Sequence, residues 1–279
     1  MTDAPQTRKA AAPAPAAPAA QGAKGAPSPI VQMTGIHLAF GKKVILKGLD
    51  LTVAPRERLV IMGQSGGGKS TTLRLILGIL HPGSGSVKFK GEEVTRMTRP
   101  RLNHMRQRIG MVYQYSALIS SLSVRDNLAL PLEELTEKPR KEIDAIVEEK
   151  LTLVGMEDTR DYMPAQLSGG MKKRIGLARA LVLNPELILF DEPSAGLDPV
   201  VSSVIDELII ALTEKTGATS IIVTHEMDSA FRIATRMAML YQGKIIEEDR
   251  PERFRHSDDP VVSQFVEGRT DGPISTTQT

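Results

Sequence analysis

A glycine-rich segment that ends in lysine and serine is the first place in this 279-residue sequence where residue types and spacing could do chemistry. It matches the pattern G-x-x-x-x-G-K-[ST] with Gly63, Gln64, Ser65, Gly66, Gly67, Gly68, Lys69 and Ser70, and Thr71 follows. Glycines let the backbone curl so that several N–H groups point at phosphate oxygens. Lys69 can then place its charge on the β- and γ-phosphates, and Ser70 can offer a hydroxyl to Mg²⁺. An apolar run before the segment and a periodic helix after it favour a phosphate-binding loop over a chance glycine-rich turn.

Two adjacent acids, Asp191 and Glu192, follow the apolar run Leu187–Phe190. Neighbouring anions repel each other, and a buried charge is costly without a partner. A bound Mg²⁺ removes this conflict, because Asp191 can hold the ion while Glu192 orients and activates an attacking water. The alternative is an ordinary acidic turn after a strand. With a phosphate loop upstream, the pair predicts a nucleotide hydrolase.

A third segment, Ser168-Gly169-Gly170, opens a predicted helix just before the acidic strand. Ser168 is a good N-cap, and the two glycines leave backbone N–H groups bare. The segment therefore predicts a second anion site, although it could simply be a capped helix. Because the first loop already covers one side of the phosphates, a second site suggests that two chains share each nucleotide.

These residues must be positioned by strands that alternate with helices. We expect strands at 30–40, 44–46, 58–62, 87–89, 109–113, 187–190, 220–224 and 237–241. We expect helices from residue 69 to about 80 and at 170–183, 200–214 and 228–234, with an inserted helical block at about 116–167. This alternation predicts an α/β fold with a mostly parallel sheet covered on both faces.

The first 30 residues differ from the rest in composition. They contain 11 Ala and 6 Pro, and Arg8, Lys9, Lys24 and Asp3 give them a net charge of +2. The whole chain is also +2, from 35 Lys+Arg and 33 Asp+Glu, so residues 31–279 hold 32 of each sign. A neutral body argues against a nucleic-acid groove, and we expect no nucleic-acid partner. Residues 1–29 are expected to be a disordered Ala/Pro-rich tail, with a tether or recognition peptide as the alternative.

Other function classes are excluded by what the sequence lacks. It has no Cys, which excludes disulfides, Cys-based zinc sites and thiol redox chemistry. It has no stretch of about 18 apolar residues, so no membrane-spanning helix is expected, and the prolines of the tail do not fit a signal peptide. We expect residues 30–268 to form the folded domain and residues 269–279 a flexible C-terminal tail.

Together the motifs resemble the ATP-binding subunit of ATP-binding-cassette (ABC) transporters, over about residues 31–250. The segments that match the Walker A, Walker B, signature and D-loop motifs are Gly63–Ser70, Leu187–Glu192, Ser168–Gly170 and Ser194–Asp198. Gln114 resembles the Q-loop glutamine, which touches Mg²⁺ and faces the transmembrane partner, and His225 resembles the switch histidine. Phe40 lies where the family stacks an aromatic ring on adenine. Alone, these three would be an ordinary loop amide, a strand-end histidine and a core aromatic.

The resemblance implies a P-loop NTPase fold: a parallel core sheet, an antiparallel β subdomain and an inserted helical subdomain. It implies ATP and Mg²⁺ as cofactors and a homodimer that sandwiches two ATP molecules head to tail. Each site would take Lys69, Ser70, Gln114, Asp191, Glu192 and His225 from one chain and Ser168 and Gly170 from the other. Ser70, Gln114 and Asp191 would bind the metal. The remaining ATP-binding residues would include Thr71, Gly169 and Asp198.

The helix that begins at the signature motif indicates which subgroup of the family the sequence resembles. Met171 stands where the family usually has Gln, and Lys172, Lys173 and Arg174 follow, although these basic residues could equally form a solvated helix face. This basic helix start and the C-terminal segments DDPVVSQFVEG (258–268) and DGPI (271–274) resemble the Mla/Mce-type subgroup, which moves phospholipids between bacterial envelope membranes. The implied partners are a multi-spanning permease, a STAS-domain protein and an MCE-domain lipid-binding protein. The implied location is the cytoplasmic face of the inner membrane, as a peripheral protein.

Other functions remain as alternatives. Within transport, an importer of amino acids or another small solute differs from the lipid subgroup only around Met171 and the tail. ABC ATPases that act on DNA or ribosomes carry zinc cysteines, coiled-coil insertions or two cassettes, none of which this sequence has. A non-catalytic regulatory cassette is disfavoured because Lys69, Asp191, Glu192 and His225 are all present.

Overall fold

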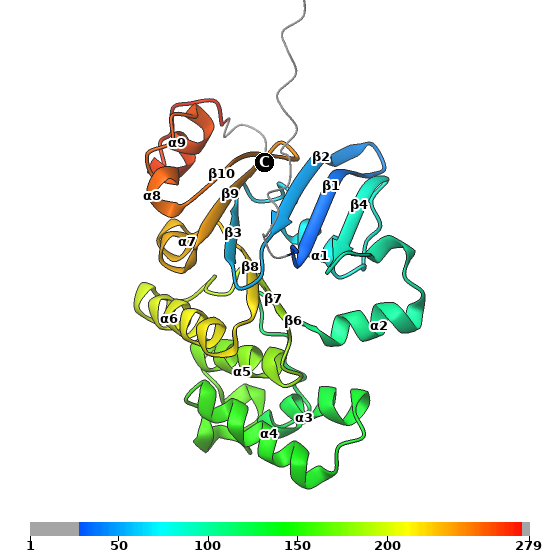
Figure 1. The fold of residues 1–279 in the computed structure, drawn as a ribbon. Coiled ribbons are helices and arrows are strands. Elements are labelled where there is room, and N and C mark those ends of the chain that lie inside the picture. The colour runs from blue at the N-terminus through cyan, green and yellow to red at the C-terminus, as the bar shows by residue number, and fades with distance from the viewer. Residues whose placement is uncertain (1–27, 275–279) are drawn as a thin grey trace, which may run out of the picture.

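Two sheets form the framework of residues 28–274, the part of the chain that the computed structural model describes (Figure 1). The expected Ala/Pro-rich tail therefore lies almost entirely outside the described residues. The strands are β1 (Val31–Phe40), β2 (Lys43–Val53), β3 (Arg58–Met62), β4 (Ser84–Phe89), β5 (Glu92–Glu93), β6 (Ile109–Val112), β7 (Leu187–Asp191), β8 (Thr219–Val223), β9 (Arg236–Tyr241) and β10 (Lys244–Asp249). The helices are α1 (Lys69–Ile76), α2 (Arg99–Gln107), α3 (Val124–Leu135), α4 (Arg140–Leu153), α5 (Gly169–Leu181), α6 (Pro199–Thr216), α7 (Met227–Ile233), α8 (Pro251–Phe254) and α9 (Pro260–Glu267).

The core sheet has the strand order β10-β9-β3-β8-β7-β6. Its five strands from β9 to β6 are parallel, and only β10 at the edge is antiparallel. β3, β7 and β8 lie next to one another, so their carboxyl ends meet at one edge of the sheet. In open α/β sheets, ligands bind outside the carboxyl ends of the strands. The glycine-rich loop follows β3, the acidic pair Asp191 and Glu192 lies at the end of β7, and His225 follows β8.

Alternate residues of each core strand enter two separate hydrophobic cores, one on each face of the sheet. In β3, Val60 and Met62 face the core that the helices α3 to α7 complete, whereas Leu59 and Ile61 face the core shared with α1 and the smaller sheet. Both faces are apolar because both are covered, which explains why the run RLVIM has no polar alternation. The prediction of a parallel sheet covered on both faces is confirmed.

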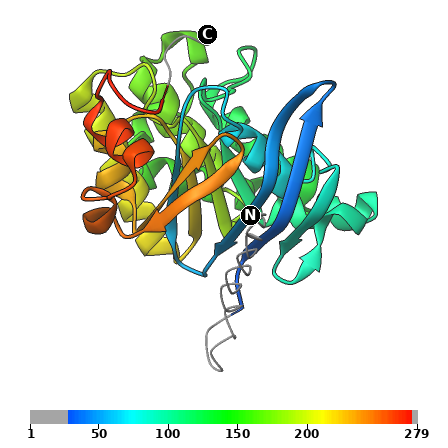
Figure 2. The same ribbon diagram turned by 90° about the horizontal axis from the view of Figure 1, so that it is seen from above.

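The smaller sheet is antiparallel, in the order β2-β1-β4-β5 (Figure 2). We expected the second strand only at 44–46, but β2 continues to Val53, and Leu49, Leu51 and Val53 are buried on one face. Irregular pairing between β1 and β2 breaks the simple period-two pattern that would have revealed the full strand. This sheet confirms the expected antiparallel β component of the fold.

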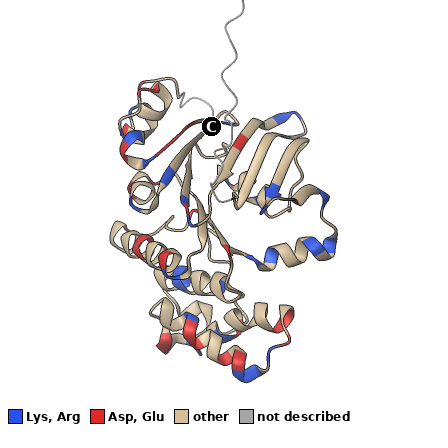
Figure 3. Ribbon diagram, in the orientation of Figure 1, with Lys and Arg blue, Asp and Glu red and all other residues tan. Residues whose placement is uncertain are grey.

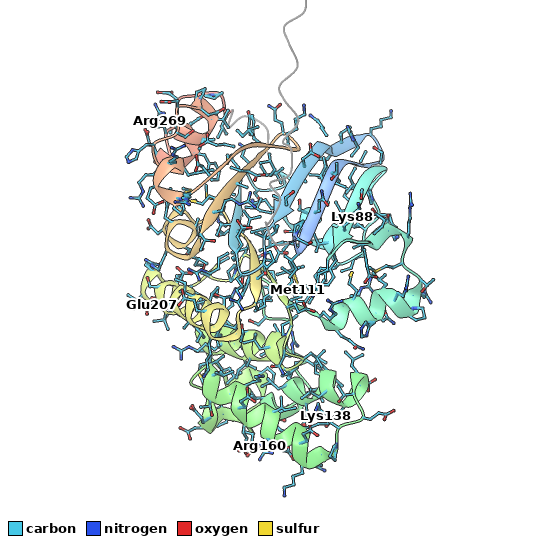
Figure 4. The ribbon with its side chains drawn as sticks, viewed as in Figure 1. Lys88, Met111, Lys138, Arg160, Glu207 and Arg269 are labelled. Atoms are coloured by element: carbon cyan, nitrogen blue, oxygen red, sulfur yellow. The ribbon has the colours of Figure 1, made fainter. Side chains whose placement is uncertain are left out.

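The segment at 116–167 contributes α3 and α4, which pack beside α5 below the core sheet (Figure 1). Ser123 is the N-cap of α3, and its hydroxyl accepts a hydrogen bond from the N–H of Asp126. Lys138 and Arg160 lie at the far end of this helical part, away from Met111 on β6 (Figure 4).

Residues 31–279 carry no net charge, but their charged side chains are unevenly distributed. Lys and Arg gather along α2, which contains Arg99, Arg101 and Arg106, whereas Asp and Glu gather on α4 (Figure 3). The sequence analysis missed α2 because its apolar positions are few and two of its residues are Pro and Asn. Opposite charges therefore cancel over residues 31–279, although α2 is strongly basic.

The start of the predicted C-terminal tail contacts α9. Residues 269–273 are exposed, whereas Ile274 is buried and donates its N–H to Oε1 of Gln264 at 2.7 Å. Gln264 is itself buried, so its amide would lack partners without this segment. In the described part of the chain, none of the helices is long and apolar enough to cross a membrane.

Candidate nucleotide-binding and catalytic site

The glycine-rich loop joins β3 to α1, as the sequence predicted. Gly63 has φ of 146°, and a Cβ at this position would collide with the carbonyl oxygen of Leu240 on β9. Gly68 is the N-cap of α1 with φ of 105°, where a Cβ would lie 3.0 Å from Leu46. Both positions therefore need glycine. The loop ends at the helix N-terminus, where backbone N–H groups and the helix dipole favour an anion.

Lys69 lies in the first turn of α1 and is buried. Its ammonium donates to the carbonyl oxygens of Gly63 and Gln64 at 2.7 and 3.0 Å, so it lies across its own loop. Burial lowers the pKa of Lys69, and the carboxylates of Glu192 and Asp191 oppose this shift. A partly desolvated cation at a helix N-terminus is well suited to a polyanion such as a nucleotide phosphate.

Ser70 and Asp191 connect the loop to the acidic strand. The Ser70 hydroxyl donates to Oδ1 of Asp191 at 2.7 Å, although the residues belong to α1 and β7. A hydroxyl and a carboxylate are hard oxygen donors of the kind that Mg²⁺ prefers. Among the described residues, no group of three or more His, Cys, Asp or Glu could hold a metal ion. A Mg²⁺ ion here would therefore share its coordination with nucleotide phosphates and water, which is usual for this ion.

Glu192 and His225 meet across the ends of β7 and β8. Nδ1 of His225 lies 3.0 Å from Oε1 of Glu192, and the His225 backbone N–H donates to Oε2 at 3.4 Å. Glu192 has φ of 51°, in the left-handed region that a glutamate rarely adopts. Its N–H donates to the carbonyl of Val223, which helps to hold this conformation. Such strain typically occurs at functional sites.

These residues line one cavity of ≈ 230 Å³. Its walls are Ser65, Gly66, Gly68, Lys69, Ser70, Thr71, Gln114, Glu192 and His225. Asp191 joins the site through its hydrogen bond with Ser70. Residues from four separate parts of the sequence thus converge where the sequence analysis expected a nucleotide site.

Lys173 is a residue of this site that the sequence analysis did not identify. It was considered with Lys172 and Arg174 as a basic run that could be a solvated helix face, but its side chain is buried. Its ammonium donates to the carbonyl of Gln114 at 2.6 Å and to that of Glu192 at 3.3 Å. Burial lowers its pKa, against the charges of Glu226 and Glu192. Lys173 therefore links the two loops that carry predicted catalytic residues.

Besides Asp191 and the loop residues Gly63, Gln64 and Gly67, five predicted site residues do not line the cavity. Phe40 ends β1 and is half-exposed, in the hairpin whose second strand contacts the glycine loop at Gly68. Ser168, Gly169 and Gly170 open α5, where the Ser168 hydroxyl accepts the N–H of Met171. Asp198 caps α6. The signature segment lies against the D-loop and the start of α6, because Gly169 faces Leu197 and Gly170 faces Val201. Its helix N-terminus is exposed and does not line the cavity of its own chain.

Comparisons with known proteins agree with this geometry. The sequence profile of the "ABC transporter" family matches residues 46–195. The chain is 40% identical over 244 residues to the "Probable ribonucleotide transport ATP-binding protein mkl" of Mycobacterium tuberculosis, covering 88% of this chain and 68% of the relative. It is 39% identical over 245 residues to the "Intermembrane phospholipid transport system ATP-binding protein MlaF" of Haemophilus influenzae, covering 88% and 93% of the two chains.

A solved structure also matches. It is titled as a dimeric post-hydrolysis state of the ATP-binding cassette MJ0796 bound to ADP and Pi, and it has a TM-score of 0.71 and 31% identity, covering 79% of this chain and 98% of that one. The match to a family profile over more than half of the chain, together with relatives of about 40% identity, agrees with the P-loop fold and the converged site. The chain therefore belongs to the ABC transporter family and is the ATP-hydrolysing subunit of such a transporter.

Proposed function

We propose that the cavity binds ATP with Lys69 on the β- and γ-phosphates and Glu192 beside the attacking water. The loop N–H groups and the α1 N-terminus face the same space as Lys69, which supports phosphate binding there. Glu192 lines the same cavity, with its carboxylate 3.0 Å from His225 Nδ1, so it can accept a proton from water while His225 contacts the γ-phosphate. Phe40 is half-exposed on the adjoining hairpin and would stack on adenine.

Mg²⁺ would be held by Ser70, Asp191 and Gln114, whose side chains are all oxygen donors. When bound, the ion neutralises phosphate charge. The protein's own part is positional: Ser70 and Asp191 already lie within hydrogen-bonding distance, and Lys173 holds the backbone of Gln114. Catalysis then comes mostly from orientation and electrostatic stabilisation.

A second copy of the chain would complete each site. Ser168, Gly169 and Gly170 form an exposed helix N-terminus, which is a good anion site, yet it does not line the cavity of its own chain. Asp198 and Val200 beside it are also exposed. Two copies placed head to tail would bring this segment to the open side of the partner's ATP.

For the cargo, we propose phospholipids that move between the membranes of a bacterial envelope. The observation that carries this proposal is the 39% identity to a phospholipid-transport ATPase over 93% of that protein's length. The mycobacterial relative has a name that suggests ribonucleotides instead, and the chain spans a smaller share of it, 68%. Ribonucleotide transport is therefore the second candidate, ahead of an amino-acid importer.

A permease would dock beside Gln114. Three bulky side chains around this residue are exposed: Tyr113, Tyr115 and Ile119. A groove of ≈ 310 Å³ follows the open edge of β6, and Tyr113, Leu130 and Leu183 line it. Such an exposed apolar surface is typical of an interface. The protein would then lie peripherally on the cytoplasmic face of the inner membrane, with a STAS-domain protein and an MCE-domain lipid-binding protein in the same complex.

The proposal that phospholipids are the transported molecules can be tested by purifying the tagged chain from detergent-solubilised membranes. The proteins and lipids that accompany it are then identified. Phospholipid transport predicts a multi-spanning permease, an MCE-domain protein and bound phospholipid. Leu130→Glu places a charge in the groove and is compared with the wild-type chain. This variant should no longer bring the permease with it, but it should still bind ATP. A permease that comes with a nucleotide-binding or amino-acid-binding protein would contradict the proposal.

A further inference from the structure

Asp206 is a fully buried carboxylate that the ATP site does not use. It lies on α6, and its Oδ2 accepts a hydrogen bond of 2.6 Å from the guanidinium of Arg232 on α7. Its other oxygen, Oδ1, has no hydrogen-bond partner among the described residues. Burial raises the pKa of Asp206, and the nearby Ser229 hydroxyl and the Arg232 guanidinium oppose that shift. Arg232 is 36% exposed, and the cost of removing the Asp206 carboxylate from water offsets much of the attraction between the two charges, so stability alone explains this pair poorly.

The pair joins the helices that follow the two catalytic strand ends. α6 follows β7 and Glu192, and α7 begins two residues after His225. The two helices lie side by side on the same face of the core sheet (Figure 1). A fixed contact between Asp206 and Arg232 therefore limits how far the loops that carry Glu192 and His225 can move apart.

Two buried serines extend this connection to the loop behind Glu192. Ser194 is fully buried, and its hydroxyl lies 3.3 Å from that of Ser229 on α7. Ser229 precedes Arg232 by three residues, so both lie on one side of α7. We call Asp206, Arg232, Ser194 and Ser229 the α6–α7 clamp.

The contact between Glu192 and His225 needs support from elsewhere in the structure. The His225 side chain is 58% exposed, so close packing around the ring does not hold it in place. Glu192 has a backbone conformation that persists only when its surroundings enforce it. In the α6–α7 clamp, Asp206, Ser194 and Ser229 are buried and Arg232 is partly exposed. The clamp joins the helices that follow both loops, so it can supply that support.

We propose that Asp206 and Arg232 are positioning residues for ATP hydrolysis. Their ion pair holds α7 against α6, and the clamp thereby keeps Nδ1 of His225 within reach of the Glu192 carboxylate. This inference rests on the proposed roles of Glu192 and His225. It adds that an ion pair outside the ATP cavity, of which only the carboxylate is buried, sets the separation of these two side chains.

The kinetic test compares Asp206→Asn, Arg232→Gln and the double variant with two matched controls. Glu207→Gln changes the neighbouring carboxylate, which lies on the exposed side of α6 (Figure 4). Glu57→Gln breaks the ion pair between Glu57 and Arg236, which lies at the opposite ends of the core strands. Asp206→Asn should lower kcat about tenfold, because a small displacement of a catalytic group is costly, while KM for ATP stays within about twofold. The double variant should lose no more than the worse single variant.

A spectroscopic readout separates positioning from general stability. The chain has only five histidines, so ¹⁵N-histidine NMR of the full chain gives few ring signals, and His225→Ala identifies that of His225. Asp206→Asn should shift the His225 Nδ1 signal, whereas Glu207→Gln and Glu57→Gln should not. This readout does not require hydrolysis, so it tests the clamp even if the proposed function fails.

Three results would overturn the inference. In the first, Asp206→Asn lowers Tm but leaves kcat and the His225 signal unchanged, which makes the pair purely structural. In the second, kcat falls while the His225 signal stays in place, so the pair acts by another route. In the third, Glu57→Gln reduces kcat as much as Asp206→Asn does, so any lost ion pair has the same effect.

Discussion

The hydroxyl of Ser70 donates a hydrogen bond of 2.7 Å to Oδ1 of Asp191, although 121 residues separate them in the chain. The phosphate loop and the acidic strand are thus in direct contact. A Mg²⁺ ion that binds to both groups must replace this hydrogen bond. The two side chains should therefore act together in metal binding.

Loss of the Ser70 hydroxyl should weaken the response to Mg²⁺. Ser70→Ala should raise the Mg²⁺ concentration for half-maximal ATP hydrolysis about tenfold, because one polar interaction with a charged group is lost. Asp191→Asn should raise it further. Ser65→Ala is the control, since Ser65 lines the same cavity without contacting Asp191. An equal Mg²⁺ response in Ser70→Ala and Ser65→Ala would remove Ser70 from the metal site.

Glu192→Gln should separate binding from hydrolysis. The amide keeps the shape of the side chain but cannot take a proton from water, so kcat should fall by at least about a hundredfold. ATP binding should persist, and dimers should accumulate with ATP in size-exclusion chromatography coupled to light scattering. Rapid hydrolysis by this variant would exclude Glu192 as the general base.

Lys173→Met should disturb the two loops that carry Gln114 and Glu192. Without the ammonium, the Gln114 and Glu192 carbonyls lose a shared donor, so kcat should fall about tenfold. Lys172→Met is the neighbouring control. If Lys172→Met loses the same activity, the loss reflects the charge of the helix rather than this contact.

The same variant predicts a pH dependence of stability. The pKa of Lys173 is lower in the folded chain than its ordinary value of 10.5, so at alkaline pH the unfolded chain binds more protons. The free energy of unfolding that Lys173 contributes should therefore rise as the pH increases toward 10.5. Urea titrations of the wild type and Lys173→Met at about pH 8 and about pH 10 should show a difference that grows with pH. A constant difference would contradict the lowered pKa.

Phe40 should contribute to ATP affinity and not to chemistry. Phe40→Ala should raise KM for ATP about tenfold, the value of one aromatic–base stack, with little change in kcat. Phe40→Tyr should behave as the wild type because the ring remains. A lower melting temperature without any change in KM would show instead that the ring only packs against the protein.

The residues proposed to bind ATP were easier to predict from the sequence than the buried residues that hold them in place. Gly63–Ser70, Asp191 and His225 were identifiable because each follows a short apolar strand, and parallel strands bring such segments to one edge of a sheet. Lys173 was not, because a lysine on a helix carries no mark of whether it faces water or the core. Burial of Asp206 was hidden in the same way, since its partner Arg232 is 26 residues distant. The contact of Ile274 with α9 was not predicted because it depends on one buried amide, that of Gln264.

The central claim is that each ATP site takes its phosphate loop from one chain and its signature segment from another. The direct measurement mixes two inactive variants, Lys69→Ala and Ser168→Arg, and follows ATP hydrolysis as a function of their ratio. If the sites form between chains, a mixed dimer has one site with both parts intact, and an equal mixture should recover about a quarter of wild-type activity when pairing is random. If each site forms within one chain, every mixture stays inactive although mixed dimers form, and the account is contradicted.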